Sequence, residues 1–108
     1  MKKSEVKDII TKNCQKFKYS VDVTNSFKRD LVNCYFRGLN TGLLVEAVEI
    51  LASEGILPQK YNPYPLHGNY QGFMECHILP DWLLVWKQED TNLVLLLTNT
   101  GSHNYIFG

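Results

Sequence analysis

Two histidines and one aspartate stand in settings that suit acid–base chemistry. His77 lies near the end of a strand-like run, Asp81 follows directly after a proline, and His103 follows a Gly-Ser pair close to the C-terminus. Histidine changes charge near neutral pH, so His77 and His103 can share the roles of general acid and general base while a carboxylate orients or charges one of them. The structural alternatives are a hydrogen-bonded strand histidine, a surface histidine and an aspartate that only shapes a turn.

A proline separates the strand that carries His77 from the next strand. Pro80 lacks a backbone N–H and favours an extended residue before it, so we expect one strand over 73–78 and a second over 82–88. Alternation along the first strand places Glu75 and His77 on the same face, which we expect to be the more solvated one. Glu75 is expected to form a structural hydrogen bond or salt bridge there.

The rest of the sequence supplies the elements that must position these residues. Hydrophobic spacing and capping residues predict a helix over 4–17, a strand over 19–23 and two further helices over 24–37 and 40–55. A loop rich in tyrosine and proline over 57–72 and a last strand over 93–98 complete the order. The first helix of the resulting hairpin is expected to turn inward Phe27, Leu31, Cys34 and Tyr35.

This order of elements predicts an α+β fold. A two-helix hairpin would pack on an antiparallel sheet of about four strands, with an extra helix at the N-terminus. The 108 residues are 44% hydrophobic, which is enough for one compact domain, and no apolar run approaches the length of a membrane span. The three cysteines have no metal-binding spacing, so we expect buried, reduced thiols in a cytoplasmic protein without a metal or cofactor.

Charge divides the chain into a basic extension and an acidic body. Residues 1–18 carry six lysines and two acidic residues, a net charge of +4, whereas residues 19–108 carry five basic and nine acidic residues, a net charge of −4. Strong general binding to nucleic acid normally needs Lys and Arg against the phosphates, which the body lacks. We therefore expect a basic amphipathic extension over 1–18 and a main domain over 19–108. The lysine-rich face of the extension is either simply solvated or serves as an RNA-binding arm.

Several ordered motifs of the main domain resemble the YafQ branch of the RelE/ParE toxin superfamily. The motifs are Leu57-Pro58, Tyr61, Pro65-Leu66-x-Gly68-x-Tyr70-x-Gly72, Glu75-Cys76-His77-Ile78, Pro80-Asp81-Trp82-Leu83-Leu84 and Thr100-Gly101-Ser102-His103, with Phe107 after them. The resemblance covers roughly residues 19–108. It implies a RelE-like α+β domain with two helices on an antiparallel sheet, in agreement with the order of elements.

The resemblance also implies a function and a set of partners. Toxins of this kind belong to type II toxin–antitoxin systems, enter the ribosomal A site and cut translated mRNA, and a cognate antitoxin wraps and silences them. The implied partners are therefore an antitoxin protein, the ribosome and mRNA, with operator DNA contacted only through the antitoxin complex. Neither a membrane nor DNA alone is an expected partner.

By resemblance, the active site falls on residues that the motifs share with the family. RNA cleavage of this type deprotonates a ribose 2′-hydroxyl, stabilises an anionic phosphorane and protonates the leaving 5′-oxygen. We expect His103 to be the general acid and His77 or Asp81 to be the base or the orienting group. The residues expected to contact RNA, by stacking, by shaping the pocket or by charge, are Trp82, Phe107 and Lys60.

Three positions depart from the family pattern. Tyr64 stands where the family usually has a histidine, and Met74 and Asn99 stand where it usually has arginines that would hold the scissile phosphate. Tyrosine acts as an acid or base only if its pKa of about 10 is lowered, so Tyr64 is catalytic only with a cation nearby. The alternative function is therefore a catalytically attenuated toxin-fold protein that acts as an antitoxin-binding module.

Overall fold

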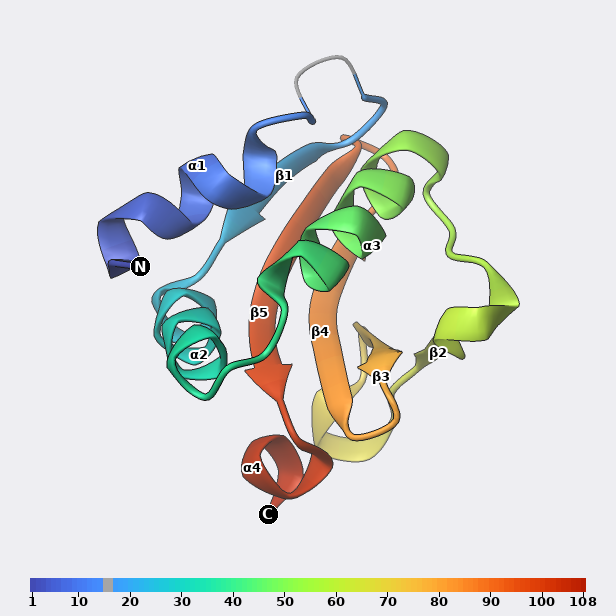
Figure 1. Cartoon of the computed structure of the whole chain (residues 1–108). Helices are drawn as coiled ribbons and strands as arrows, with labels where there is room; N and C mark the ends of the chain where they lie inside the picture. The colour runs from blue at the N-terminus through green and yellow to red at the C-terminus, as the bar shows by residue number, and fades with distance from the viewer. Residues whose placement is uncertain (15–16) are drawn as a thin grey trace.

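The computed structural model describes residues 1–14 and 17–108, which form a sheet with a layer of helices on one face (Figure 1). The elements, with 3-10 helices written η, are η1 (Lys3–Glu5), α1 (Val6–Thr11), β1 (Ser20–Val23), α2 (Asn25–Phe36), α3 (Thr41–Glu54), η2 (Gln59–Tyr61), β2 (Tyr64–Pro65), η3 (Gly68–Tyr70), β3 (Phe73–Leu79), β4 (Trp82–Glu89), β5 (Val94–Gly101) and α4 (His103–Phe107). This order confirms the predicted α+β class.

The sheet has five strands in the order β1-β5-β4-β3-β2. It exceeds the expected four because the loop over 57–72 contributes the two-residue strand β2, in which Tyr64 pairs with Glu75. Strands β3, β4 and β5 are antiparallel neighbours as predicted, and β2 also pairs antiparallel with β3, but β1 runs parallel to β5. A parallel pair needs a long crossover connection, and the helices between β1 and β5 supply it.

Local capping signals set the ends of the two hairpin helices. The Thr24 hydroxyl accepts a hydrogen bond from the backbone N–H of Phe27 at 3.1 Å at the start of α2, and the Asn40 side chain caps α3 by accepting from Gly42 at 3.0 Å. Gly55 ends α3 with φ 76°, and a Cβ there would lie 2.9 Å from the Tyr19 ring. These boundaries match the predicted ones.

The inward faces of α2 and α3 form the core with one face of the sheet. The predicted inward residues are buried, namely Phe27, Leu31, Cys34, Leu44, Ala47, Val48 and Leu51. The prediction was wrong for Tyr35, which is 44% exposed at the border of this stripe and packs edge-to-face on Phe36 instead. All three cysteines are free and buried, as expected. No helix within residues 1–14 and 17–108 combines the length and apolar character needed to cross a membrane.

The N-terminal helix packs into this core. α1 and η1 are shorter than the helix expected over 4–17, part of which, at positions 15–16, lies outside the described residues. Val6 and Ile10 are fully buried, and α1 contacts α2, α3 and β1. The helix therefore extends the hydrophobic core beside the sheet, as Figure 1 shows at the upper left.

Truncation of Ile10 to alanine tests this packing. We expect Ile10→Ala to lower the free energy of unfolding by about 2–5 kcal/mol, because it removes a fully buried side chain and leaves a cavity. Ile9→Ala on the same helix, where the side chain is only partly buried, is the matched control and is expected to cost less. Urea titration measures both values, and equal losses would mean that α1 does not pack as described.

The opposite face of the sheet carries a row of four paired side chains, one from each of four strands and three of them polar. Tyr64 pairs with Glu75, Glu75 with Val85, and Val85 with Asn99, so all four side chains point to the same side. Along β4, this row alternates with side chains of the helix-side core, which are Trp82, Leu84 and Trp86. The row therefore lies on the face away from the helical layer.

The C-terminal helix α4 folds back against this second face. A Cβ on Gly101, at the end of β5, would lie 2.8 Å from the Tyr105 ring, so only glycine permits this close approach. Gly101 pairs with Leu83, which in turn pairs with His77. The helix that starts at His103 is thereby brought near the strand that carries His77.

Candidate active site

The β3–β4 hairpin brings His77 and Asp81 to the same end of the sheet. Strand β3 ends at Leu79 and β4 begins at Trp82, so Pro80 and Asp81 form the turn. The Nδ1 atom of His77 lies 3.2 Å from the carbonyl oxygen of Pro80. A carbonyl oxygen can only accept a hydrogen bond, so Nδ1 is the nitrogen that carries a proton.

Asp81 also holds the start of α4. Its Oδ1 atom accepts a hydrogen bond from the backbone N–H of His103 at 3.2 Å. Ser102 caps the helix, its hydroxyl accepting from the backbone N–H of Tyr105 at 3.1 Å. His103 is exposed, and so is Asp81. The fold thus places the Asp81 carboxylate against the backbone of His103, with both residues at the surface.

Aromatic rings lie beside this histidine. The ring centroids of His103 and Phe107 are 5.1 Å apart, and Tyr70 of η3 packs edge-to-face on Phe107 at 4.9 Å. The loop that contains η3 therefore contacts α4. We did not single out Tyr70 from the sequence as a site residue, although it stands in the tyrosine-rich loop.

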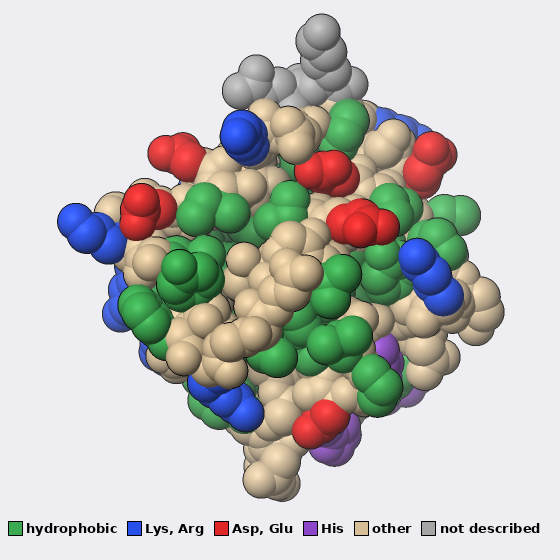
Figure 2. Space-filling view, in the orientation of Figure 1, with side chains coloured by type: hydrophobic (Ala, Val, Ile, Leu, Met, Phe, Trp, Pro, Cys, Tyr) green, Lys and Arg blue, Asp and Glu red, His purple; other side chains and the backbone are tan. Residues whose placement is uncertain are grey.

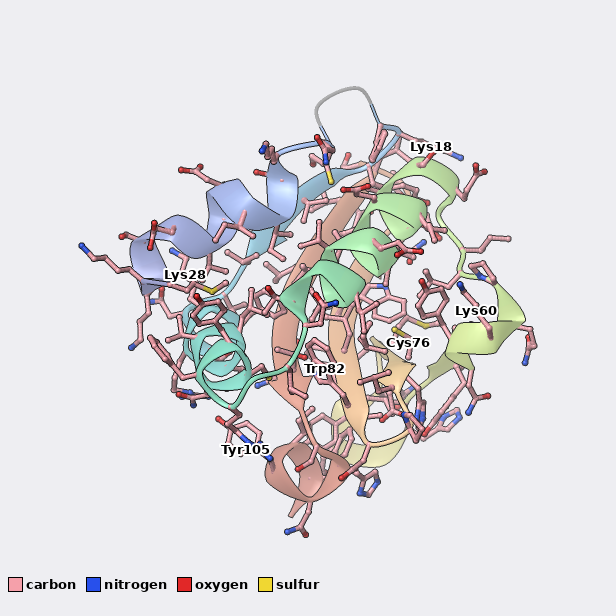
Figure 3. All side chains as sticks on the ribbon, viewed as in Figure 1. Lys18, Lys28, Lys60, Cys76, Trp82 and Tyr105 are labelled. Atoms are coloured by element: carbon pink, nitrogen blue, oxygen red, sulfur yellow. The ribbon has the colours of Figure 1, made fainter. Side chains whose placement is uncertain are left out.

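A buried carboxylate anchors α4 to α2. Asp30 is fully buried, and its Oδ1 accepts a 2.6 Å hydrogen bond from the Tyr105 hydroxyl and longer ones from the Arg29 guanidinium. Its Oδ2 accepts from the Asn99 side chain at 3.1 Å and from the backbone N–H of Thr100 at 3.2 Å. Figure 3 shows Tyr105 lying between α4 and α2. Asp30 was not among the predicted site residues, yet it fixes the helix that carries His103.

Glu75 lies behind His77 and is buried, with only 1% of its surface exposed. The prediction of a solvated face was wrong here, because Tyr64 and Val85 flank Glu75 within the row and strand β2 covers the edge of β3. One carboxylate oxygen lies 3.8 Å from Nε2 of His77. Neither oxygen has a hydrogen-bond partner among the described residues, so of the hydrogen bond or salt bridge expected for Glu75 only the ion-pair contact with His77 is present.

Tyr64 lies opposite Glu75 and is 41% exposed. Its hydroxyl approaches the Glu75 carboxylate without the geometry of a formed hydrogen bond, and this interaction, followed by desolvation, raises the pKa of Tyr64. The hydroxyl therefore stays protonated at neutral pH. It is suited to donate a hydrogen bond, and the lowered pKa that a general base would need is not produced here.

Trp82 is not available for stacking on RNA. The side chain is 2% exposed, and its indole N–H donates to the Thr100 hydroxyl at 2.8 Å inside the core. The prediction that Trp82 could stack on a base was therefore wrong, because alternation turns it to the helix side with Leu84 and Trp86. Figure 3 places Trp82 beneath the helical layer, where it can only shape the floor of a pocket.

Two small pockets flank the hairpin turn. One, of about 230 Å³, is lined by Asp81, Arg37 and Ser102 among others, and a second, of about 170 Å³, is lined by His77 and Lys60 among others. Each pocket thus joins a predicted site residue to a cation. Figure 2 shows histidine side chains gathered towards the bottom of the view beside an acidic side chain. Arg37 was missed in the sequence because it lies at the end of a helix, far from the motifs.

The two positions that lack the expected arginines have structural roles. Met74 is half-buried and packs against the hydrophobic core. Asn99 donates to the buried Asp30 carboxylate. Neither side chain is placed to replace a phosphate-binding cation, so any such charge must come from elsewhere in the site.

The arrangement can transfer protons at an exposed surface. His103 and Asp81 are accessible, an aromatic ring lies beside the imidazole, and a cation lines the adjacent pocket. Among the residues that the structure describes, there is no cluster of three or more His, Cys, Asp or Glu side chains arranged to hold a metal ion.

Comparison with known proteins gives a consistent result. The family model described as "Bacterial toxin of type II toxin-antitoxin system, YafQ" matches residues 19–108. The "mRNA interferase toxin YafQ" of Escherichia coli K12 is 38% identical over 52 residues, which is 48% of this chain but only 54%, about half, of that relative. The protein of the same name from E. coli B / BL21-DE3 is 27% identical over 89 residues, covering 82% of this chain and 95% of the relative.

Solved structures resemble the fold closely. The toxin chain in the E. coli DinJ-YafQ toxin–antitoxin complex superposes with a TM-score of 0.77 at 26% identity, over 85% of this chain and 100% of that chain. A metal-bound toxin from Helicobacter pylori superposes with a TM-score of 0.76 at 35% identity, over 82% of this chain and 99% of that chain.

Proposed function

This chain belongs to the YafQ family of bacterial toxins from type II toxin–antitoxin systems, and from that premise we propose that it is an mRNA endoribonuclease that acts on the ribosome. E. coli proteins that match it are mRNA interferase toxins by name. The proposal is supported most directly by the contact of Asp81 with the backbone of His103, whose imidazole lies next to Phe107 at an exposed surface. A carboxylate and an imidazole on neighbouring elements, beside an aromatic ring, suit cleavage of single-stranded RNA.

We propose His103 as the general acid that protonates the leaving 5′-oxygen. Asp81 uses Oδ1 to hold the backbone of His103, and its other oxygen is free to take the proton of the 2′-hydroxyl. His77 has both ring nitrogens directed at protein groups, Pro80 and Glu75, so its role is to stabilise charge rather than to abstract a proton. Tyr64, with its raised pKa, would donate a hydrogen bond to the phosphate.

RNA binding would use the aromatic ring and the cations around the turn. Phe107 is half-buried, with Tyr70 and His103 packed against it, and the exposed part of its ring would contact a base. Arg37 and Lys60 line the pockets beside Asp81 and His77 and are the cations closest in position to attract phosphates. They would offset the acidic body of the chain.

Partners and location follow from the same family. A relative is solved in complex with an antitoxin, and we propose a cognate antitoxin for this chain, with operator DNA contacted through that complex and the ribosome in the cytoplasm as the target. The sheet ends at β1 and β2, and an edge strand is a common place for a partner to add a strand. Residues 1–18 lie outside the family match, and we propose that they are an extension packed on the toxin domain.

Expression of the chain in growing bacteria, with and without its antitoxin, tests the proposed function. We expect growth arrest that the antitoxin relieves, and cleavage of translated mRNA within codons when programmed ribosomes are mapped by primer extension. Naked mRNA without ribosomes serves as the control and is expected to stay intact. Normal growth and intact mRNA from folded protein would overturn the enzyme proposal.

One observation favours the alternative of an antitoxin-binding module. The environment of Tyr64 does not activate it, and Met74 and Asn99 are engaged within the fold. A protein of this kind would bind the antitoxin tightly but leave mRNA uncut. Antitoxin binding measured by calorimetry, beside the cleavage assay on the same preparation, separates the two functions.

A further inference from the structure

Near the site, the Glu75 carboxylate is buried without the hydrogen bonds that would compensate its burial. Only 1% of it is exposed, and neither oxygen accepts a hydrogen bond from the described residues. An ionised or polar group in this state costs free energy unless a partner compensates it. Glu75 sits in the middle of strand β3, between Tyr64 and Val85, where an apolar residue would cost nothing.

His77 is a basic group placed to compensate the charge of this carboxylate. Its Nε2 atom lies 3.8 Å from Oε2 of Glu75, while Nδ1 lies 3.2 Å from the Pro80 carbonyl oxygen. Nδ1 must donate to that carbonyl, so Nε2 faces Glu75 with either a lone pair or a proton. A lone pair against a bare carboxylate would be repulsive, so the two side chains must hold at least one proton between them.

The other titratable groups around Glu75 cannot supply that proton. The pKa of Tyr64, across on β2, is raised by Glu75, so its hydroxyl keeps its own proton. Cys76, next along β3, points into the helix-side core, where burial and the Glu75 charge raise its pKa to about 12. The partner on β4 is Val85, which is apolar. His77 is left as the group that shares a proton with Glu75.

Resting on the proposed endoribonuclease function, we infer that Glu75 is a positioning residue of the active site: its carboxylate holds the His77 imidazole through the ion-pair contact with Nε2. With Nδ1 fixed by Pro80, the ring is held at both nitrogens. The carboxylate also lies behind the Tyr64 hydroxyl, so the same buried group positions two side chains that face the substrate. Neither effect requires Glu75 to touch RNA.

Substitution of Glu75 separates this role from simple packing. We expect Glu75→Gln, which keeps the shape but cannot release a proton, to lower kcat for ribosomal mRNA cleavage by about tenfold to hundredfold with KM unchanged. Glu75→Ala is expected to lower kcat at least as far. Glu54→Gln is the matched control, since Glu54 is an exposed glutamate at the end of α3 that lines neither pocket beside the hairpin turn, and we expect its kcat to equal that of the parent chain.

A measurement on the ring itself keeps the inference testable if the chain proves not to cleave RNA. In histidine labelled with ¹⁵N, the Nε2 chemical shift of His77 at neutral pH is expected to change in Glu75→Gln relative to the parent chain, because Nε2 faces the carboxylate, while that of exposed His67 stays unchanged. Thermal melting shows that the variant is folded. An unchanged Nε2 chemical shift of His77 in a folded Glu75→Gln protein would overturn the inference, and so would parental kcat in both Glu75 variants of an active enzyme.

Discussion

Replacing His103 with alanine is expected to lower the rate of ribosomal mRNA cleavage by about 10²- to 10⁴-fold, the usual cost of losing one general acid or base. The leaving 5′-oxygen needs a proton, and His103 is an exposed imidazole at the start of α4, beside the Phe107 ring. Alanine keeps the backbone N–H that donates to Asp81, so the helix stays in place. Single-turnover cleavage on programmed ribosomes, scored by primer extension, measures the loss.

His67 provides the matched control for this experiment. It is an exposed histidine in the loop before η3, and its side chain makes no capping hydrogen bond. We expect His67→Ala to cleave at the parental rate. If His103→Ala kept that rate as well, the general acid would have to be sought elsewhere, and the pairing of Asp81 with His103 would be no more than a helix contact.

Elements with local signals could be predicted from the sequence. Thr24, Asn40 and Gly55 set the ends of α2 and α3 through contacts within a few residues, and Pro80 marked the turn between β3 and β4. The short strand β2 could not be found this way, because two residues carry no periodicity and their pairing depends on where β3 lies. The parallel pairing of β1 with β5 likewise depends on the whole crossover.

The positions of the candidate site residues could be predicted only where they depend on local contacts. His77 and Asp81 are close along the chain, so one hairpin holds them, whereas the contact of Asp81 with His103 depends on α4 folding back. The burial of Glu75 could not be read from alternation, which assigns a face but not what covers it. The burial of Trp82 could have been read, because it shares its face with apolar residues along β4.

Asp30 left a signal in the sequence that was not used. It stands three residues after Phe27 and next to Leu31, on the inward stripe of α2, where a carboxylate must be buried and therefore must find donors. Apart from the neighbouring Arg29, the donors come from β5 and α4, about seventy residues away, as the separations of 69 to 75 residues in these hydrogen bonds indicate. Their identity could not be predicted without the fold.

Asp30→Asn is expected to lower the free energy of unfolding by about 3 kcal/mol, because a fully buried carboxylate with several donors loses one acceptor oxygen. Donors face both oxygens, with Tyr105 and Arg29 on Oδ1 and Asn99 and the Thr100 N–H on Oδ2. Whichever way the new amide turns, its NH₂ group opposes another donor. Urea titration measures the loss, and α4 is expected to loosen with it, so that cleavage also falls.

Tyr105→Phe is the control, since it removes one donor and leaves the carboxylate with the others. We expect a smaller loss in the free energy of unfolding than for Asp30→Asn, and a defined pH dependence of that loss.

The pH dependence follows from the pKa of Tyr105. The hydrogen bond to Asp30 raises this pKa above its usual 10.0, so the folded state favours the protonated hydroxyl. That contribution is fully present below pH 10 and is lost as the pH rises through the raised value. The stability difference between parent and Tyr105→Phe should therefore be constant near neutral pH and shrink above pH 10. A difference that grows in alkali, or an Asp30→Asn variant as stable as the parent chain, would mean that α4 is held by other contacts.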